Sequence, residues 1–152
     1  MDRRGVLPLL TLAGVVLATA SPAGAKTPLP GFRSPSGNIK CLVVPGARTA
    51  TLRCEIGRAD YARTLQQRCL GPSGGGVDWH GFELGAGRKG AITCSGGILY
   101  NPGTERPTYV TLPYGRSWRD GSFTCWSRPT GVTCRERTGH GLFVSRQGWR
   151  AW

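Results

Sequence analysis

The chain has 152 residues, a formal net charge of +12, six cysteines and 24 glycines. This length suits one domain with a modest core and leaves no room for a large multidomain enzyme. The composition also excludes a membrane-spanning helix, because the longest apolar stretch has about 15 residues and spanning needs about 20.

The first 25 residues have the pattern of a signal peptide. Arg3 and Arg4 give a short positive start, the stretch 6–20 is apolar, and small residues end at Ala25. No cysteine follows this site to carry a lipid anchor. We therefore expect cleavage near Ala25 and a mature protein in the extracellular or cell-envelope space, with no integral membrane segment after processing. The export route stays open.

The mature chain that follows is strongly basic. Residues 26–152 hold 18 basic and seven acidic side chains, and arginine supplies 15 of the cations. Prolines at positions 28 and 30 disfavour a helix, so residues 26–31 are expected to form an extended lead-in without a core of their own. Residues 32–152 are expected to form a single β-rich, disulfide-stapled domain.

A five-residue pattern recurs three times along the domain, at 37–41, 90–94 and 121–125. Each copy reads Gly, any residue, a large apolar residue, a polar residue and Cys. Side chains two apart share one face of a strand, so each apolar residue and cysteine should point inward and the polar residue outward. The unequal spacing of the copies argues against a repeat protein.

An even number of cysteines in an exported chain predicts three disulfides. Turn residues at 127–131 place a hairpin between Cys125 and Cys134, and Pro45-Gly46 does the same between Cys41 and Cys54. This hairpin argument leaves Cys69 to pair with Cys94. Free thiols or a zinc site are the alternatives, but no C-x-x-C motif is present and the two histidines lie far apart. We therefore expect no metal and no cofactor.

The remaining elements are short. Strands are predicted at 77–84, 109–112, 141–145 and 149–152, and one helix is predicted at 60–69 with Asp60 as its cap. Tyr61, Leu65 and Cys69 would share one face of this helix. The expected fold is therefore all-β and mainly antiparallel, a small sandwich or open barrel with little helix.

Arginines alternate with aromatic rings in the last third of the chain. Arginine donates paired hydrogen bonds to phosphate or carboxylate, and aromatic rings stack on sugars and cations. The candidate binding residues are Arg116, Trp118, Arg119, Arg135, Arg137, Arg146, Trp149 and Arg150. Charge that reflects composition alone is the alternative interpretation. Trp126 should face away from the side that its neighbour Cys125 faces.

His140, between two glycines, is a weak candidate for a catalytic residue. A hydrolytic arrangement would need a serine such as Ser122, Ser127 or Ser145, but no nucleophile-elbow motif is present. A glycine-flanked histidine bound to the backbone in a turn is the simpler interpretation. His80 is expected to be a surface partner of Asp78.

Three stretches carry a resemblance to a known family: residues 32–41, residues 112–115 and the run from 131 to 146. Through them the mature chain resembles a family of small secreted domains of unknown function found in actinobacteria. The resemblance implies a secreted, six-cysteine β domain. It implies no activity, because the family has none assigned.

Three functions are compatible with these features. The first is a non-catalytic binding module for anionic envelope polymers or glycans, with nucleic acid not specifically indicated. The second is a small secreted hydrolase that uses His140. The third is a secreted inhibitor or effector that presents a rigid loop, such as 128–131, to a protein partner.

Overall fold

The computed structural model describes residues 25–95 and 99–152, so the expected signal peptide lies outside the described residues except for Ala25. The described part contains eleven strands and one helix, which confirms the prediction of a β-rich fold with little helix. The elements in chain order are β1 (Thr27–Arg33), β2 (Ile39–Val44), β3 (Thr51–Ile56), α1 (Ala62–Leu70), β4 (Trp79–Gly85), β5 (Ala91–Cys94), β6 (Glu105–Thr111), β7 (Ser117–Asp120), β8 (Phe123–Arg128), β9 (Gly131–Glu136), β10 (Gly141–Val144) and β11 (Trp149–Ala151).

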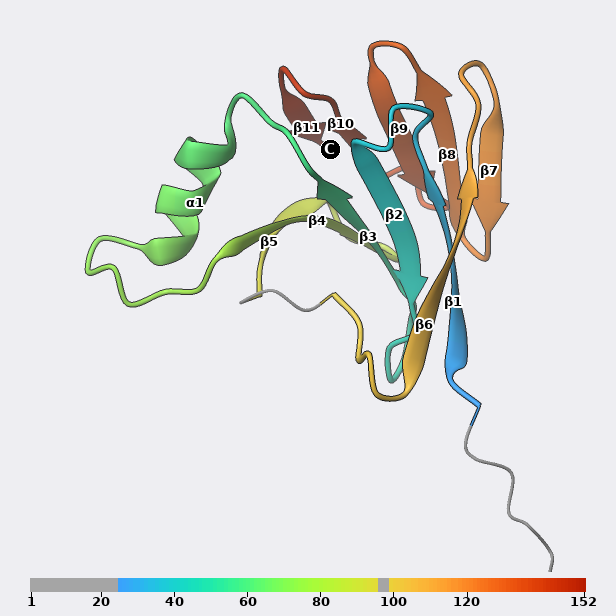
Figure 1. Ribbon diagram of the computed structural model, residues 1–152, viewed down its shortest axis with the longest axis horizontal. Helices are drawn as coiled ribbons and strands as arrows, with labels where there is room; N and C mark the ends of the chain where they lie inside the picture. Colours follow the sequence, from blue (N-terminus) through green and yellow to red (C-terminus); the bar gives the residue numbers. More distant parts are fainter. Residues whose placement is uncertain (1–24, 96–98) are drawn as a thin grey trace, which may run out of the picture.

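The strands form two sheets that pack together as an open sandwich. The six-stranded sheet has the order β5-β4-β3-β2-β1-β6, and the five-stranded sheet has the order β11-β10-β9-β8-β7. All pairings are antiparallel except that of β1 with β6. Helix α1 lies at the opposite end of the molecule from β7 (Figure 1). The sheets do not close into a barrel, so the sandwich alternative is the correct one.

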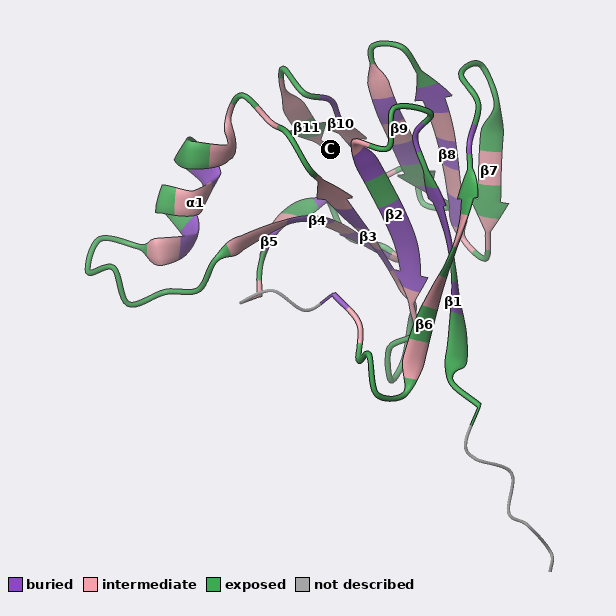
Figure 2. Ribbon diagram, in the orientation of Figure 1, coloured by how far each residue is buried: buried purple, intermediate pink, exposed green. Residues whose placement is uncertain are grey.

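The core fills the space between the sheets. Phe32 and Phe82 enter it from the six-stranded sheet, and Phe123 and Leu142 enter it from the five-stranded sheet. Buried residues follow β1, β2, β3, β8 and β9, while most of the loop residues and the outer side of α1 are exposed (Figure 2). Within each strand, buried and more exposed residues alternate, because successive side chains point to opposite faces of the sheet.

All three predicted disulfides are confirmed. Cys41–Cys54 joins directly opposite residues of β2 and β3, and Cys125–Cys134 does the same for β8 and β9. Cys69–Cys94 joins α1 to the edge strand β5. The described residues leave no cysteine free.

The second copy of the five-residue pattern departs from its prediction. Thr93 is buried and Cys94 is exposed, whereas the first and third copies bury the cysteine as expected. Cys94 reaches Cys69 on the helix, which lies beyond the edge of the sheet, and not a strand inside the core. The partner of the cysteine therefore decides its direction.

The lead-in is extended as predicted but belongs to the sheet. Strand β1 begins at Thr27, not near Phe32, and Leu29 is buried. In a parallel pair, only every second residue of a strand directs its backbone amide and carbonyl toward the partner strand. Because the Thr27 amide donates to the carbonyl oxygen of Thr104, just before β6, Pro28 and Pro30 take positions that need no amide toward β6. The two prolines are therefore compatible with the pairing.

The helix occupies Ala62–Leu70 and buries Leu65 and Cys69, close to its prediction. Asp60 does not cap it, since no side-chain hydrogen bond caps the helix. Asp60 instead accepts from the Arg146 Nε at 3.2 Å, because the β10–β11 turn lies beside the helix start. The described residues contain no helix with the length and apolar character needed to span a membrane.

Removing the core disulfide Cys125–Cys134 should destabilise the domain strongly. The double variant C125A/C134A should lose about 3 kcal/mol from restored chain entropy alone, and more from lost packing, because both cysteines are buried. Urea unfolding followed by tryptophan fluorescence measures this loss. A loss below about 1 kcal/mol would contradict the importance of this bridge.

Candidate functional site

The outward positions of the five-stranded sheet gather arginine and aromatic side chains. Cys125 and Cys134 point into the core, so residues one place away along β8 and β9 point outward. Trp126 is one of these residues and is half-buried, and Arg135 is another and is exposed. The prediction that Trp126 faces away from the cysteine side is confirmed.

Strand pairing arranges these outward side chains in two rows that cross the strands. The first row contains Ser117, Trp126, Thr133, Phe143 and Arg150. The second row contains Arg119, Thr124, Arg135 and Gly141, and the backbone of Trp152 bonds that of Gly141 beyond it. We call the following set the arginine–aromatic face: Arg119, Trp126, Arg128, Arg135, Phe143, Arg150 and Trp152.

The arginine–aromatic face is cationic. Among the described residues, no aspartate or glutamate occupies an outward position of β7 to β11. Asp120 and Glu136 both pair with Phe123 across neighbouring strands, which places them on the core side of the sheet, and Glu136 is 4% exposed. The arginines of the face therefore have no acidic neighbour in their rows.

The ring of Trp152 contacts two arginines of the face, Arg135 and Arg150. The guanidinium carbon of Arg135 lies 5.7 Å from the centre of the Trp152 ring, and that of Arg150 lies 5.3 Å from it. The ring covers Gly141, where an added Cβ would collide with it. The absence of a side chain at Gly141 thus lets one ring lie near two cations, an arrangement favoured by cation–π attraction.

Two shallow depressions of similar size interrupt the face. One has a volume of about 340 Å³ and is lined by Trp126, Arg128, Thr133 and Arg135. The other has a volume of about 350 Å³ and is lined by Phe143, Gly148, Trp149 and Arg150. Each depression combines at least one aromatic ring with at least one guanidinium group.

The structure brings together part of the predicted binding set. Arg119, Arg135 and Arg150 take outward positions in the two rows. Trp118 points the other way and packs on Phe32, with ring centres 5.1 Å apart. Trp118 therefore lies outside the outward rows, because the alternation of β7 turns it toward the core.

The other predicted residues lie at the margin of the sheet. Trp149 packs on Phe82 at 5.1 Å and also lines the second depression. Arg116 precedes β7, and Arg137 lies in the β9–β10 turn. Arg146 is held by Asp60 in the β10–β11 turn and does not lie in either row.

His140 occupies the β9–β10 turn and contacts backbone. Its Nδ1 lies 3.2 Å from the carbonyl oxygen of Trp152. Within residues 25–95 and 99–152, no hydrogen bond joins His140 to a serine or to a carboxylate. Ser145, one of the serine candidates, donates its hydroxyl to the Gly148 carbonyl. This geometry matches a structural turn residue and offers no activated nucleophile.

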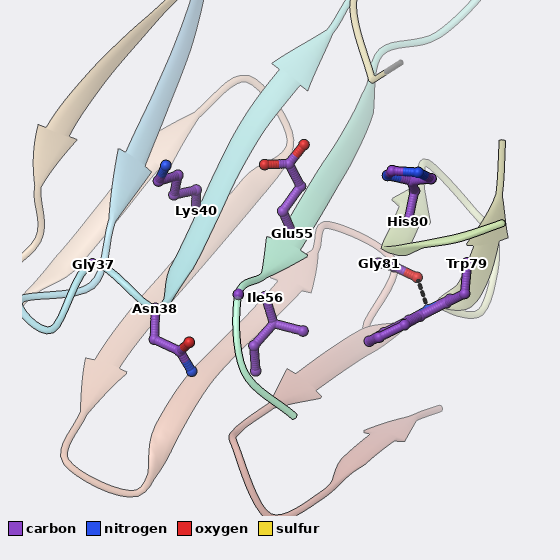
Figure 3. Close-up of a pocket in the computed structure, with 9 residues that line it drawn as sticks. Gly37, Asn38, Lys40, Glu55, Ile56, Trp79, His80 and Gly81 are labelled. Carbon is purple, nitrogen blue, oxygen red and sulfur yellow. Dashed lines mark hydrogen bonds between the residues drawn. The ribbon is translucent and has the colours of Figure 1, made fainter. Parts of the chain in front are cut away.

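A separate hollow lies on the six-stranded sheet. It has a volume of about 390 Å³, and its lining includes Lys40, Glu55 and His80 from three neighbouring strands (Figure 3). A β-bulge between Trp79 and Phe82 puts both of these rings on the core side. Figure 3 shows the indole of Trp79 donating to the Gly81 carbonyl, a bond of 2.8 Å.

This hollow is less suited to a polyanion than the arginine–aromatic face. Lys40 stands directly opposite Glu55, so one positive and one negative charge share its floor. The expected partnership of His80 with Asp78 is not formed, because Asp78 accepts from the Gln66 side chain at 2.7 Å. The hollow can hydrogen-bond a mixed polar group, but it concentrates no charge of one sign.

Sequence reasoning missed Trp126, Thr133, Phe143 and Trp152 as members of the site. The signal was present in the strand alternation. Positions 126 and 133 neighbour cysteines that had been assigned to the core, so both had to face outward. Adjacency of arginine to an aromatic ring along the chain was a weaker guide, since adjacent strand residues face opposite ways.

Comparison with known proteins shows the family of the chain. The model of a family of unknown function (DUF6636) matches residues 10–150. The chain belongs to this family. A search of curated proteins and a search of solved structures each found no match. The family match supports the resemblance to domains of unknown function, and it brings no residue role to this DUF6636 chain.

Glu136 orders the turn that carries Arg137 and His140 in this DUF6636 chain. The amide and the hydroxyl of Thr138 both donate to its carboxylate Oε1, the amide at 3.0 Å. The hydrogen bond from the Thr138 hydroxyl is the main reason that the pKa of Glu136 lies below its usual value. The charged form of Glu136 is therefore favoured in the folded protein.

This shift predicts a pH-dependent contribution to stability. Because the folded pKa is lowered, the stabilisation is present above the unfolded value of about 4.3 and is lost as the pH falls through the folded pKa. The variant E136Q should lower the urea midpoint more at pH 7 than at pH 3, because protonation removes part of the stabilisation at the lower pH. Equal losses at both pH values would show that charge at Glu136 plays no part.

Proposed function

We propose that this domain is a non-catalytic binding module that engages anionic glycans of the cell envelope or extracellular space through the arginine–aromatic face. The observation that carries the proposal is the composition of the outward positions of β7 to β11. They hold arginines and aromatic rings without a single acidic side chain. Guanidinium groups pair with carboxylate or sulfate, and rings pack on the C–H faces of sugars.

The electrostatic part of the proposal is supported by exposure. Arg119, Arg128, Arg135 and Arg150 are exposed, so an anion can reach each guanidinium without displacing protein groups. The guanidinium is weakly hydrated and binds anions through paired donors. Four such groups on one sheet face give an attraction that grows with the charge of the polymer.

The rigidity of the face also supports a binding role. Every side chain of the two rows projects from a strand, and the disulfide Cys125–Cys134 holds the two central strands together. A site on paired strands loses little freedom when a ligand binds, which limits the entropic cost of association.

An exported location is part of the same proposal. The three disulfides fit an oxidising compartment. An anionic polymer of the envelope or of the extracellular space would be the partner available there. Neither His140 nor the two-residue connection between β8 and β9 adds an observation that favours catalysis or a projecting inhibitory loop.

Binding to dextran sulfate at several salt concentrations tests the proposal. The variant R135Q/R150Q should weaken binding about 100-fold, or about 10-fold for each arginine. The slope of log affinity against log salt should become shallower by about 2, because two ionic contacts are lost.

The matched control is R63Q/R68Q, which removes the same charge from exposed positions of α1. This control should bind nearly as tightly as the parent chain. If both double variants weakened binding equally, net charge alone would explain the interaction and the proposed face would be wrong.

A further inference from the structure

Two aromatic residues on outward strand positions, Trp126 and Phe143, indicate which class of ligand the face could bind. Trp126 and Phe143 lie in the same cross-strand row, on β8 and β10, with Thr133 of β9 between them. Two strand spacings separate their backbone positions, which is about 10 Å. The residue between them, Thr133, has a much smaller side chain than either ring. The row therefore offers two stacking positions about one disaccharide apart.

Each of these two rings lies in a depression with at least one guanidinium group. Trp126 shares its depression with Arg128 and Arg135, and Phe143 shares its depression with Arg150. The two depressions have nearly equal volumes, about 340 and 350 Å³. Each is therefore a subsite that offers one ring for stacking and at least one guanidinium for an anion.

We propose that the arginine–aromatic face binds a linear polysaccharide with a disaccharide repeat that carries one carboxylate, running across β8, β9 and β10. This inference rests on the proposed function and names its ligand class. One sugar of each repeat stacks on Trp126 or Phe143. The carboxylate of the same repeat accepts paired hydrogen bonds from an arginine of that subsite.

A single-stranded nucleic acid fits this arrangement less well. Successive stacked bases lie about 3.4 Å apart, so a stacked strand would pass several bases between the two rings. Thr133 gives those bases no platform. Trp152 is already occupied by Arg135 and Arg150, which reduces the number of rings available for a run of bases.

Hyaluronan oligosaccharides of two, four and six sugars are suitable probes, because each disaccharide carries one carboxylate. Titration calorimetry at low salt should show the tetrasaccharide binding about 10-fold or more tightly than the disaccharide, since only the longer chain spans both subsites. A neutral chito-oligosaccharide of four sugars should bind at least about 10-fold more weakly, because it leaves the arginines unpaired.

The variants W126L and F143L test the subsites separately, and leucine keeps apolar bulk so that the fold is retained. Either variant should lower tetrasaccharide affinity about 10-fold, to the level of the disaccharide. The control is Y114L, which alters an exposed aromatic residue outside both rows and should leave affinity unchanged. Unchanged urea midpoints would verify that each variant is folded.

The outcomes separate this inference from the proposed function. If dextran sulfate binding depends on Arg135 and Arg150 but hyaluronan affinity does not grow with length, the proposed face stands and the polysaccharide inference is wrong. If neither polymer binds, both are wrong. If an oligothymidylate binds more tightly than the tetrasaccharide and is lost in W126L, the ligand is a nucleic acid and the inference is overturned.

Discussion

Two of the three disulfides meet in the middle of the core, and the rest of the structure depends on them. Cys41–Cys54 belongs to the six-stranded sheet and Cys125–Cys134 to the five-stranded sheet. The sulfurs of Cys41, Cys54 and Cys134 all lie within 4.8 Å of one another. These sulfurs are oxidised, so their proximity reflects packing of one bridge on the other and not a metal site.

Each of these bridges also fixes a register. A cross-strand disulfide between directly opposite residues prevents a slip of one residue, and such a slip would turn every side chain of the strand to the other face. For β8 and β9, such a slip would turn one of the two strands over and would bury either Trp126 or Arg135. The same covalent constraint that stabilises the core therefore keeps the arginine–aromatic face outside.

The two outer surfaces of the sandwich differ in charge for a related reason. On the outer face of the six-stranded sheet, residues of opposite charge stand across from one another on neighbouring strands. Lys40 is opposite Glu55, and Arg53 is opposite Glu83. Opposite charges on neighbouring strands attract and stabilise the sheet. The five-stranded sheet gives up this stabilisation by placing arginines without acidic partners. Such an arrangement costs stability, and the anionic ligand that we propose would supply the missing charge.

The sequence predicted local features well because these depend on short-range chemistry. Strand alternation follows from the apolar-polar-cysteine pattern, and turn residues placed the hairpins that pair Cys41 with Cys54 and Cys125 with Cys134. The rows of the face could have been derived in the same way, since β7 to β11 are consecutive antiparallel neighbours. Adjacency along the chain instead suggested Trp118, which the strand alternation turns toward the core.

The sequence by itself determined the β-rich class, the three bridges and the inward or outward direction of most strand residues, because a period of two and tight turns act over a few residues. Only the tertiary structure decided the parallel pairing of β1 with β6, the contact of Asp60 with Arg146 and the direction of Cys94. These depend on which distant segments the sandwich must bring together to bury its core, and no local pattern encodes that choice.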